Sequence, residues 1–166
     1  LISAVDDDYK PLTNSKLFDL QILVCPPELD DATPSAMGYG MAPIGAVVSV
    51  TTPSAISMNV TADIKIKSNS TRSISDIQED AEIAIENYLL EQCRYWGEMP
   101  AWNKATDSLV IYYNKIVSVL NNIDGVEVAS NVLLNGNTSD SVLVQTAHIY
   151  GTKVPELGTI TLTEVT

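Results

Sequence analysis

The chain contains a single histidine, His148, and a Ser-His-Asp catalytic triad would have to use it as the base. Such a triad also needs a serine on a strained turn, and the sequence contains no Gly-x-Ser-x-Gly pattern. His148 lies near the end of an expected strand, beside Tyr150 and Gly151, so we interpret it as an ordinary loop or strand residue. We therefore predict no catalytic residues.

Runs of acidic residues raise the question of a cation site. A calcium loop needs oxygen ligands at alternating positions, a glycine at the bend and a distal acidic residue. The run Asp6-Asp7-Asp8 is followed instead by Lys10 and Pro11. We interpret this run, and also Asp30-Asp31, as solvated turns.

The two cysteines, Cys25 and Cys93, lie far apart among apolar residues and have no neighbouring His or Cys. This spacing does not match a metal site, and we expect buried thiols, although a disulfide between them stays open. The sequence therefore predicts neither a metal nor a cofactor.

The net charge is −12 at pH 7, while only 18% of the residues are charged. An acidic surface repels nucleic-acid backbones and anionic lipid, so we expect no nucleic-acid partner. No window of 18 apolar residues occurs, and we expect no membrane insertion.

Three segments have clear periodicity or helix-end signals. Residues 56–67 alternate strictly between apolar and polar types, which predicts a half-buried strand. A helix is predicted over 73–95, with Ser73 as its N-cap and Gly97 just past its end. The segment 16–24 fits a helix or a buried strand. We favour a helix, because good N-cap residues precede it and Pro26-Pro27 follows it.

Weaker signals complete the element order. Asn114 is expected to cap a further helix that ends at Asp124-Gly125, and Asn135-Gly136-Asn137 is expected to turn a hairpin between its flanking strands. Strands are predicted at 1–5, 46–52, 109–112, 126–134, 142–145 and 159–165.

The order of elements up to residue 112 is β-α-β-β-α-β. This order is typical of a ferredoxin-like arrangement, with two helices on one face of an antiparallel sheet. We therefore predict an α+β fold, with a ferredoxin-like domain over 1–112. A subdomain of one helix and about three strands, over 113–166, is expected to pack on it.

The segment 38–45 reads Gly-Tyr-Gly-Met-Ala-Pro-Ile-Gly and runs directly into the β-branched residues 46–50. It lacks the Lys, Ser, His or Cys of a phosphate-binding or nucleophile loop, so we interpret it as a device that places a strand. This segment resembles the "GxGxAPIGAxVxV" sequence of the baseplate J-like family of contractile-tail wedge proteins. Segments 6–24, 56–62, 76–90, 110–126, 131–136 and 156–162 resemble further segments of that family, in order.

Two features depart from the family pattern. The expected helix after Pro11 is unusually apolar, and the segment 96–107, with two tryptophans, is not expected at its position.

The resemblance implies a structural protein of the baseplate of a phage or prophage contractile tail, with no catalytic residues. It also implies that the chain is the C-terminal half of a longer protein made in the bacterial cytoplasm. The implied partners are other wedge and tail proteins, in a ring or other homo-oligomer of the assembled particle.

The candidate contact regions are the loop 26–45 and the segment 96–102, with Tyr39, Met41, Trp96 and Trp102 as candidate interface residues. The tryptophans can alternatively cap the open end of a core. Two other functions stay open: a secreted or surface-displayed protein-binding module without catalysis, and a small hydrolase that uses His148.

Overall fold

The computed structural model describes residues 2–27, 34–98, 108–144 and 153–165. Trp102, His148 and Asp30-Asp31 lie outside these ranges. The chain divides into two compact units, one of Leu1–Ser54 with Gln145–Val154 and the other of Ala55–Val144 with Pro155–Thr166. The domain boundary expected at residue 112 stays a prediction, and the two units divide the chain at other positions.

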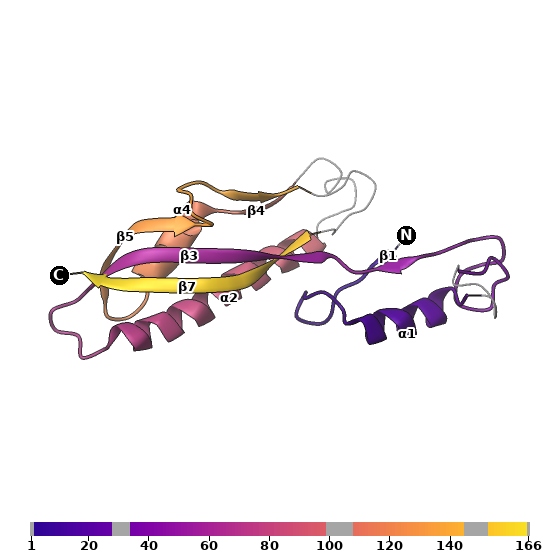
Figure 1. Ribbon diagram of the computed structural model, residues 1–166, viewed down its shortest axis with the longest axis horizontal. Helices are drawn as coiled ribbons and strands as arrows, with labels where there is room; N and C mark the ends of the chain where they lie inside the picture. The colour runs from indigo at the N-terminus through magenta and orange to yellow at the C-terminus, as the bar shows by residue number, and fades with distance from the viewer. Residues whose placement is uncertain (1, 28–33, 99–107, 145–152, 166) are drawn as a thin grey trace. The chain divides into compact units, whose positions relative to one another are not determined.

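The first unit contains β1 (Ile2–Ser3), α1 (Asn14–Val24) and β2 (Val50–Thr51) (Figure 1). The helix predicted at 16–24 is confirmed, and Thr13 is its N-cap, with a side chain that accepts from the Lys16 amide at 3.5 Å. The strands β1 and β2 form a parallel pair.

The strand predicted over 46–52 is wrong for most of its length, because only Val50–Thr51 is a strand. The physical reason is a side chain of α1 that takes the place of a partner strand. The Gln21 amide nitrogen Nε2 donates to the Val48 carbonyl at 2.9 Å, and Gln21 Oε1 accepts from the Val50 amide at 2.7 Å.

The second unit is built on a three-stranded sheet in the order β5 (Val126–Leu134), β3 (Ser54–Ile66) and β7 (Lys153–Val165). The alternation predicted for β3 is confirmed, since its inward side chains Met58, Val60, Ala62 and Ile64 are buried. β5 is antiparallel to β3, and the ribbons of β3 and β7 point the same way (Figure 1).

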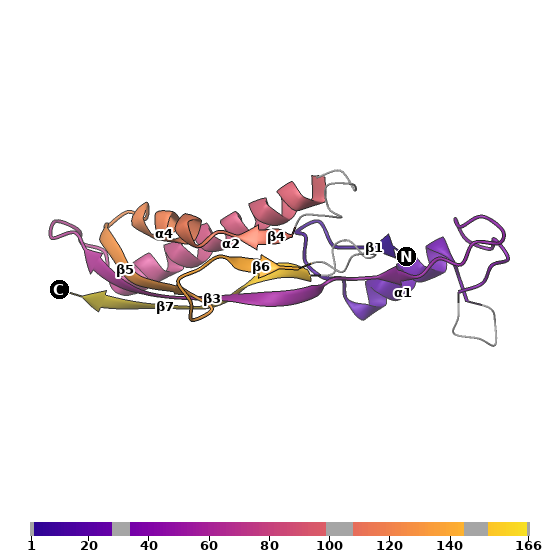
Figure 2. The ribbon, with the colours of Figure 1, turned by 90° about the horizontal axis from the view of Figure 1, so that it is seen from above.

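The helices α2 (Ile74–Glu98) and α4 (Tyr113–Asn121) lie on one face of this sheet (Figure 2). Their inward stripes meet the sheet in one apolar core, whose largest fully buried side chains include Met58, Ile64, Ile77, Ile85, Ile116, Leu120 and Leu134. The short strands β4 (Leu109–Ile111) and β6 (Ser141–Leu143) pair antiparallel beside it.

The two helices described in this unit, α2 and α4, differ from their predicted ends. α2 continues through Gly97 to Glu98, because Trp96 extends the buried stripe by a further turn and packing outweighs the glycine signal. α4 is not capped by Asn114. It begins at Tyr113, whose amide donates to Asp140 Oδ1 at 2.8 Å.

The α+β class is confirmed, but the ferredoxin-like sheet is not. Among the described strands, β1 pairs with β2, β3 pairs with β5 and β7, and β4 pairs with β6. The four strands expected to share one sheet therefore lie in three, because β3 and β4 find their partners after residue 112.

The hairpin predicted at Asn135 is half right. Asn135 and Gly136 both have positive φ, at 50° and 77°, which the predicted tight turn requires. The turn is closed by an antiparallel bridge between Leu134 and Asn137. The predicted pairing of the two flanking strands does not form, however, because the second of them, β6, pairs with β4. Asn135 itself is held by β3, since its amide donates to the Asn59 carbonyl and its Oδ1 accepts from the Asn59 amide, both at 2.8 Å.

Both cysteines are free and buried, so the open question of a disulfide is answered. Burial raises the pKa of the Cys93 thiol to about 11. We therefore expect Cys93 to remain protonated and unmodified by iodoacetamide at pH 8 in the folded protein, because the thiolate is the reactive form. Mass spectrometry of labelled peptides checks this, and rapid labelling without denaturant would contradict it.

Candidate interaction surface

The acidic run near the N-terminus forms a closed turn. Asp6 Oδ1 accepts from the Asp8 amide at 3.0 Å and from the Lys10 amide at 2.8 Å. This agrees with the predicted turn at 6–8. Across the described ranges, no group of three or more His, Cys, Asp or Glu residues is arranged to hold a metal ion.

The helix α1 is apolar on most of its surface, yet none of its residues is buried. Phe18 is 60% exposed, and Ile22 and Leu23 are also exposed. A helix that is hydrophobic on most sides normally lies inside a core, because exposed apolar area is costly in water. The first unit therefore presents a helix whose composition fits contact with another apolar surface.

The loop after α1 is fastened to the end of that helix by backbone hydrogen bonds. The Met41 amide donates to the Leu23 carbonyl at 3.1 Å, and the Ala42 amide donates to the Val24 carbonyl at 2.8 Å. These carbonyls belong to the last turn of α1 and have no partner inside the helix. The loop therefore serves as the C-terminal cap of α1, which fixes its position.

The glycines of the loop permit this attachment. A Cβ atom on Gly40 would lie 2.6 Å from the Val24 carbonyl oxygen and 2.8 Å from that of Leu23. Gly38 and Gly45 have φ of +74° and +89°, in the left-handed region that favours glycine. The glycines of 38–45 thus have two physical causes, which are close packing on the helix end at Gly40 and left-handed backbone at Gly38 and Gly45.

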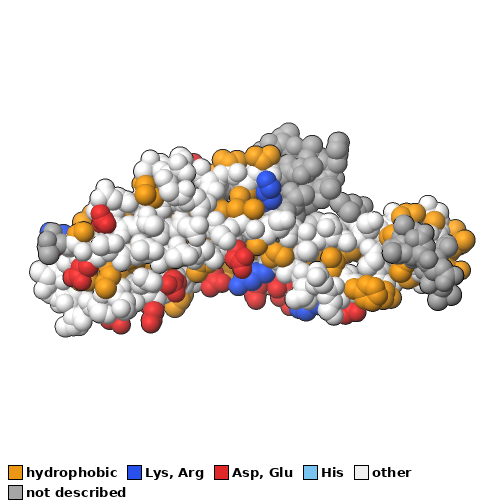
Figure 3. All heavy atoms as spheres, viewed as in Figure 1, with side chains coloured by type: hydrophobic (Ala, Val, Ile, Leu, Met, Phe, Trp, Pro, Cys, Tyr) orange, Lys and Arg blue, Asp and Glu red, His pale blue; other side chains and the backbone are white. Residues whose placement is uncertain are grey.

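The large apolar side chains of the loop are exposed, whereas those of Ser35 and Ala42 are buried. Tyr39 and Met41 are each 74% exposed and Ile44 is 84% exposed, and Met37 is exposed as well. We call Met37, Tyr39, Met41 and Ile44 the loop surface. Hydrophobic side chains are visible over α1 and the loop that follows it (Figure 3). Contiguous exposed apolar side chains on a fixed backbone are a feature of protein interaction sites.

The predicted interface residues that the structure describes fall into two groups, one exposed and one buried. Tyr39 and Met41 lie on the loop surface, as expected for contact residues, whereas Trp96 is 6% exposed and belongs to the core of the second unit. For Trp96 the alternative prediction, that the tryptophans cap the end of a core, agrees with its burial. Its Nε1 has no hydrogen-bond partner among the described residues. The exposed side chains of α1 were not among the predicted contacts, although the unusual apolarity of the helix was the available signal.

Gly40→Ala is expected to destabilise the first unit by about 2 kcal/mol, because the added Cβ would force the loop away from the helix end. Hydrogen exchange at the Met41 and Ala42 amides measures the effect, and faster exchange is expected. Gly45→Ala is the control, since its Cβ meets nothing within 4 Å and only the backbone strain applies, about 1 kcal/mol. Equal exchange rates in the two variants would contradict the close-packing argument.

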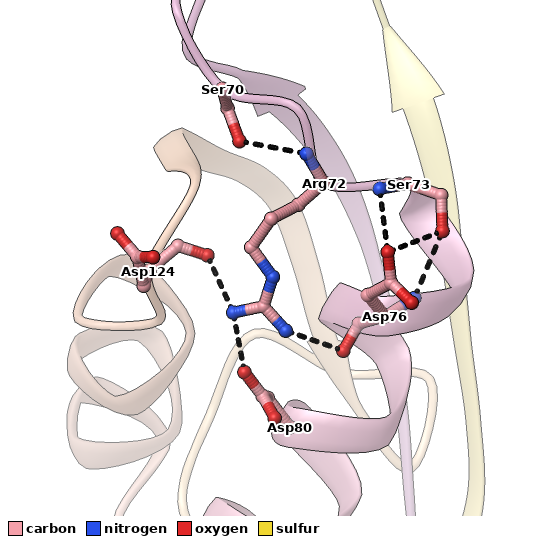
Figure 4. A network of polar contacts seen from close by, with 6 residues as sticks. All are labelled: Ser70, Arg72, Ser73, Asp76, Asp80 and Asp124. Carbon is pink, nitrogen blue, oxygen red and sulfur yellow. Dashed lines mark hydrogen bonds and ion pairs between the residues drawn. The ribbon is translucent and has the colours of Figure 1, made fainter.

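The second unit has its own polar cluster, at the start of α2 (Figure 4). The Arg72 guanidinium forms an ion pair with Asp80 at 2.6 Å and donates to the Asp124 carbonyl at 3.2 Å. Ser73 and Asp76 form a reciprocal cap, in which the Ser73 amide donates to Asp76 Oδ2 at 2.9 Å and the Asp76 amide to Ser73 Oγ at 3.2 Å. The cluster joins the start of α2 to the turn that follows α4, so we interpret it as structural.

The cap at Ser73 makes a pH-dependent contribution. Hydrogen bonds from Ser73, with a smaller effect of Arg72, lower the pKa of Asp76 below its ordinary value of 3.8. A lowered folded-state pKa stabilises the protein above the ordinary value, and this stabilisation is lost as the pH falls through the lowered one. The difference in Tm between the parent and Asp76→Ala is therefore expected to shrink at acid pH. A difference that grows on acidification would oppose this assignment.

A groove of about 460 Å³ lies between α2 and α4, lined by Asp80, Ile83, Ala84, Asn87, Val119, Asn122 and Ile123. Its lining includes the exposed isoleucine Ile83 together with the polar residues Asp80, Asn87 and Asn122.

Comparison with protein-family models gave no match, and comparison with curated proteins gave none either. Within the described residues, none of the helices has the length and apolarity needed to cross a bilayer.

Proposed function

We propose that this chain is a structural component of a contractile-tail baseplate, which acts by binding neighbouring wedge and tail proteins. The observation that carries the proposal is the exposed apolar surface of the first unit. It comprises α1, which has no buried residue, and the loop surface held on its C-terminal end.

The chemistry of this surface favours a protein partner. Within α1 the charged side chains are Lys16 and Asp19, and the loop surface at 37–45 carries none. A partner with an apolar, weakly charged face fits such a surface, because desolvation of charged groups would oppose binding. Stable interfaces of this kind bury on the order of 1,600 Å² in total.

The resemblance to baseplate J-like proteins supports the same role. The resembling segment 38–50 contains Gly40, whose lack of a side chain lets the loop pack on the end of α1. The other resembling segments include much of β3, α2, β5 and β7. The resemblance therefore includes both the strands and helices of the second unit and the loop that exposes Tyr39 and Met41.

The test is to locate the protein in a particle. Contractile tails are purified from cells that carry the gene with an epitope tag on this chain, and the tag is located with gold-labelled antibody by electron microscopy. Label at the baseplate end of the tail is expected. Purified tails without the chain would contradict the proposal, and label on the cell surface instead would favour a surface-displayed binding module.

A further inference from the structure

The strand β7 forms one edge of the sheet in the second unit. Among the described strands, the order β5-β3-β7 leaves β7 paired on one side only. β7 is long, and its ribbon runs along the border of the sheet in Figure 1. An open strand edge carries unpaired amide and carbonyl groups that bind another strand readily.

The two edge strands of this sheet, β5 and β7, differ in how well they are protected against pairing with another chain. β5 has two register irregularities against β3, and Glu127 on it pairs with Lys65. Irregular and charged edges resist pairing with other chains. In β7, residues 157–163 contain no charge and no proline, and four of the seven are β-branched. Over residues 157–163 the edge of β7 therefore lacks the usual protection against pairing, and the charges and the proline of this strand lie outside that stretch, at Lys153, Pro155, Glu156 and Glu164.

The sequence of β7 is symmetric about Thr161. Residues 159–163 read Thr-Ile-Thr-Leu-Thr, so an antiparallel copy centred on Thr161 places Thr159 opposite Thr163 and Ile160 opposite Leu162. Ile160 and Leu162 are buried on the core face, whereas the three threonines are exposed on the other face. Each residue thus meets one of its own kind, which is the self-complementarity that a two-fold interface requires.

The backbone geometry is compatible with this register. The Thr159 amide donates toward β3, to Asn59 Oδ1 at 2.8 Å. Successive residues of a strand direct their amide and carbonyl groups to opposite sides, so those of Ile160 and Leu162 point to the open edge. In the register centred on Thr161 these two residues are opposite each other and can exchange both hydrogen bonds.

From these observations we propose that two copies of this chain bind through β7, antiparallel and centred on Thr161, to make one continuous sheet. The Thr161 residues of the two copies then form a non-hydrogen-bonded pair, whose Cα atoms are about 4.5 Å apart. The proposal stands independently of the baseplate role, because it rests on the second unit alone. Since each copy carries a net charge of −12, added salt is expected to strengthen the association.

The first test is disulfide crosslinking of the full chain. Thr161→Cys places two thiols opposite each other at the two-fold axis, within the Cα separation that a disulfide allows. Thr163→Cys is the matched control on the same exposed face, but its two copies would lie about 13 Å apart. Mild oxidation is expected to crosslink the first variant only. Equal crosslinking of both, or crosslinking of neither, would overturn the proposal.

The second test uses charge at the same position and needs no oxidation. Thr161→Lys and Thr161→Glu alone are each expected to weaken self-association about 10-fold in sedimentation experiments, because like charges face each other across the axis. An equimolar mixture of the two variants is expected to restore it as a heterodimer. A parent chain that stays monomeric at high concentration and salt, or a mixture no tighter than either variant, would refute the pairing. Circular dichroism checks that both variants are folded.

Discussion

Gly158→Ala is expected to lower the free energy of unfolding of the second unit by about 3 kcal/mol. A Cβ atom at this position would lie 2.3 Å from Asn59 Oδ1 and 3.0 Å from both the carbonyl carbon and oxygen of Met58. The second of these contacts is with backbone in the middle of β3, which cannot rotate away. The two strands would have to separate where Met58 is fully buried. Chemical denaturation measures the loss.

Two further variants isolate the cause. Gly136→Ala adds a Cβ that meets nothing within 4 Å, so only its φ of +77° opposes the change and about 1 kcal/mol is expected. In an Asn59→Ala background the cost of Gly158→Ala should fall, because the closest contact is removed, although the contact with Met58 remains. Strictly additive effects of Asn59→Ala and Gly158→Ala would argue against this contact as the cause.

Local patterns in the sequence were sufficient to predict those features that depend on residues close together in the chain. The alternation of β3 predicted which side chains are buried, since a strand with one face on a core repeats every two residues. The cap at Ser73 was also predicted, because the atoms that form it lie within a few residues of each other. For α1 the sequence offered several N-cap candidates in 13–15, and the structure selects Thr13.

Strand pairing could not be predicted in the same way. The partner of β3 depends on Asn59, whose backbone binds Asn135 and whose side chain binds Thr159. These contacts span 76 and 100 positions of the chain, and no periodicity indicates them. The adjacent turn at Asn135-Gly136 gave a strong local signal and forms, but the strand that follows it, β6, pairs with β4 and not with β5.

The candidate surface was predicted in part, for a related reason. The glycines of 38–45 indicated an unusual backbone and thereby the exposed Tyr39 and Met41. They did not indicate what the loop is fastened to, because the carbonyls of Leu23 and Val24 carry no signature in sequence. The location of Trp96 could not be predicted, because large aromatic residues occur both in cores and in interfaces. Only the residues around Trp96 in the structure show that it belongs to a core.

The double variant Tyr39→Asp with Met41→Asp is expected to reduce the yield of complete contractile tails about 100-fold, while the isolated chain keeps its Tm. Both side chains are 74% exposed, so their replacement removes almost no contact within the chain. In an assembled interface the same positions would bury two carboxylates against an apolar partner. A loss of about 3 kcal/mol of binding energy at such positions corresponds to the 100-fold effect.

The control for this variant is Ile83→Asp, which introduces the same charge at an exposed apolar side chain of the second unit. It should leave the yield of tails unchanged, because Ile83 lies in the groove between α2 and α4 and outside the loop surface. Electron microscopy of tails from cells that produce each variant provides the count. Normal yield with the double variant, or an equal loss with Ile83→Asp, would show that the loop surface is not the contact. In either case the hydrogen bonds of Met41 and Ala42 to the helix end, together with the buried Ala42 side chain, would serve only the stability of the first unit.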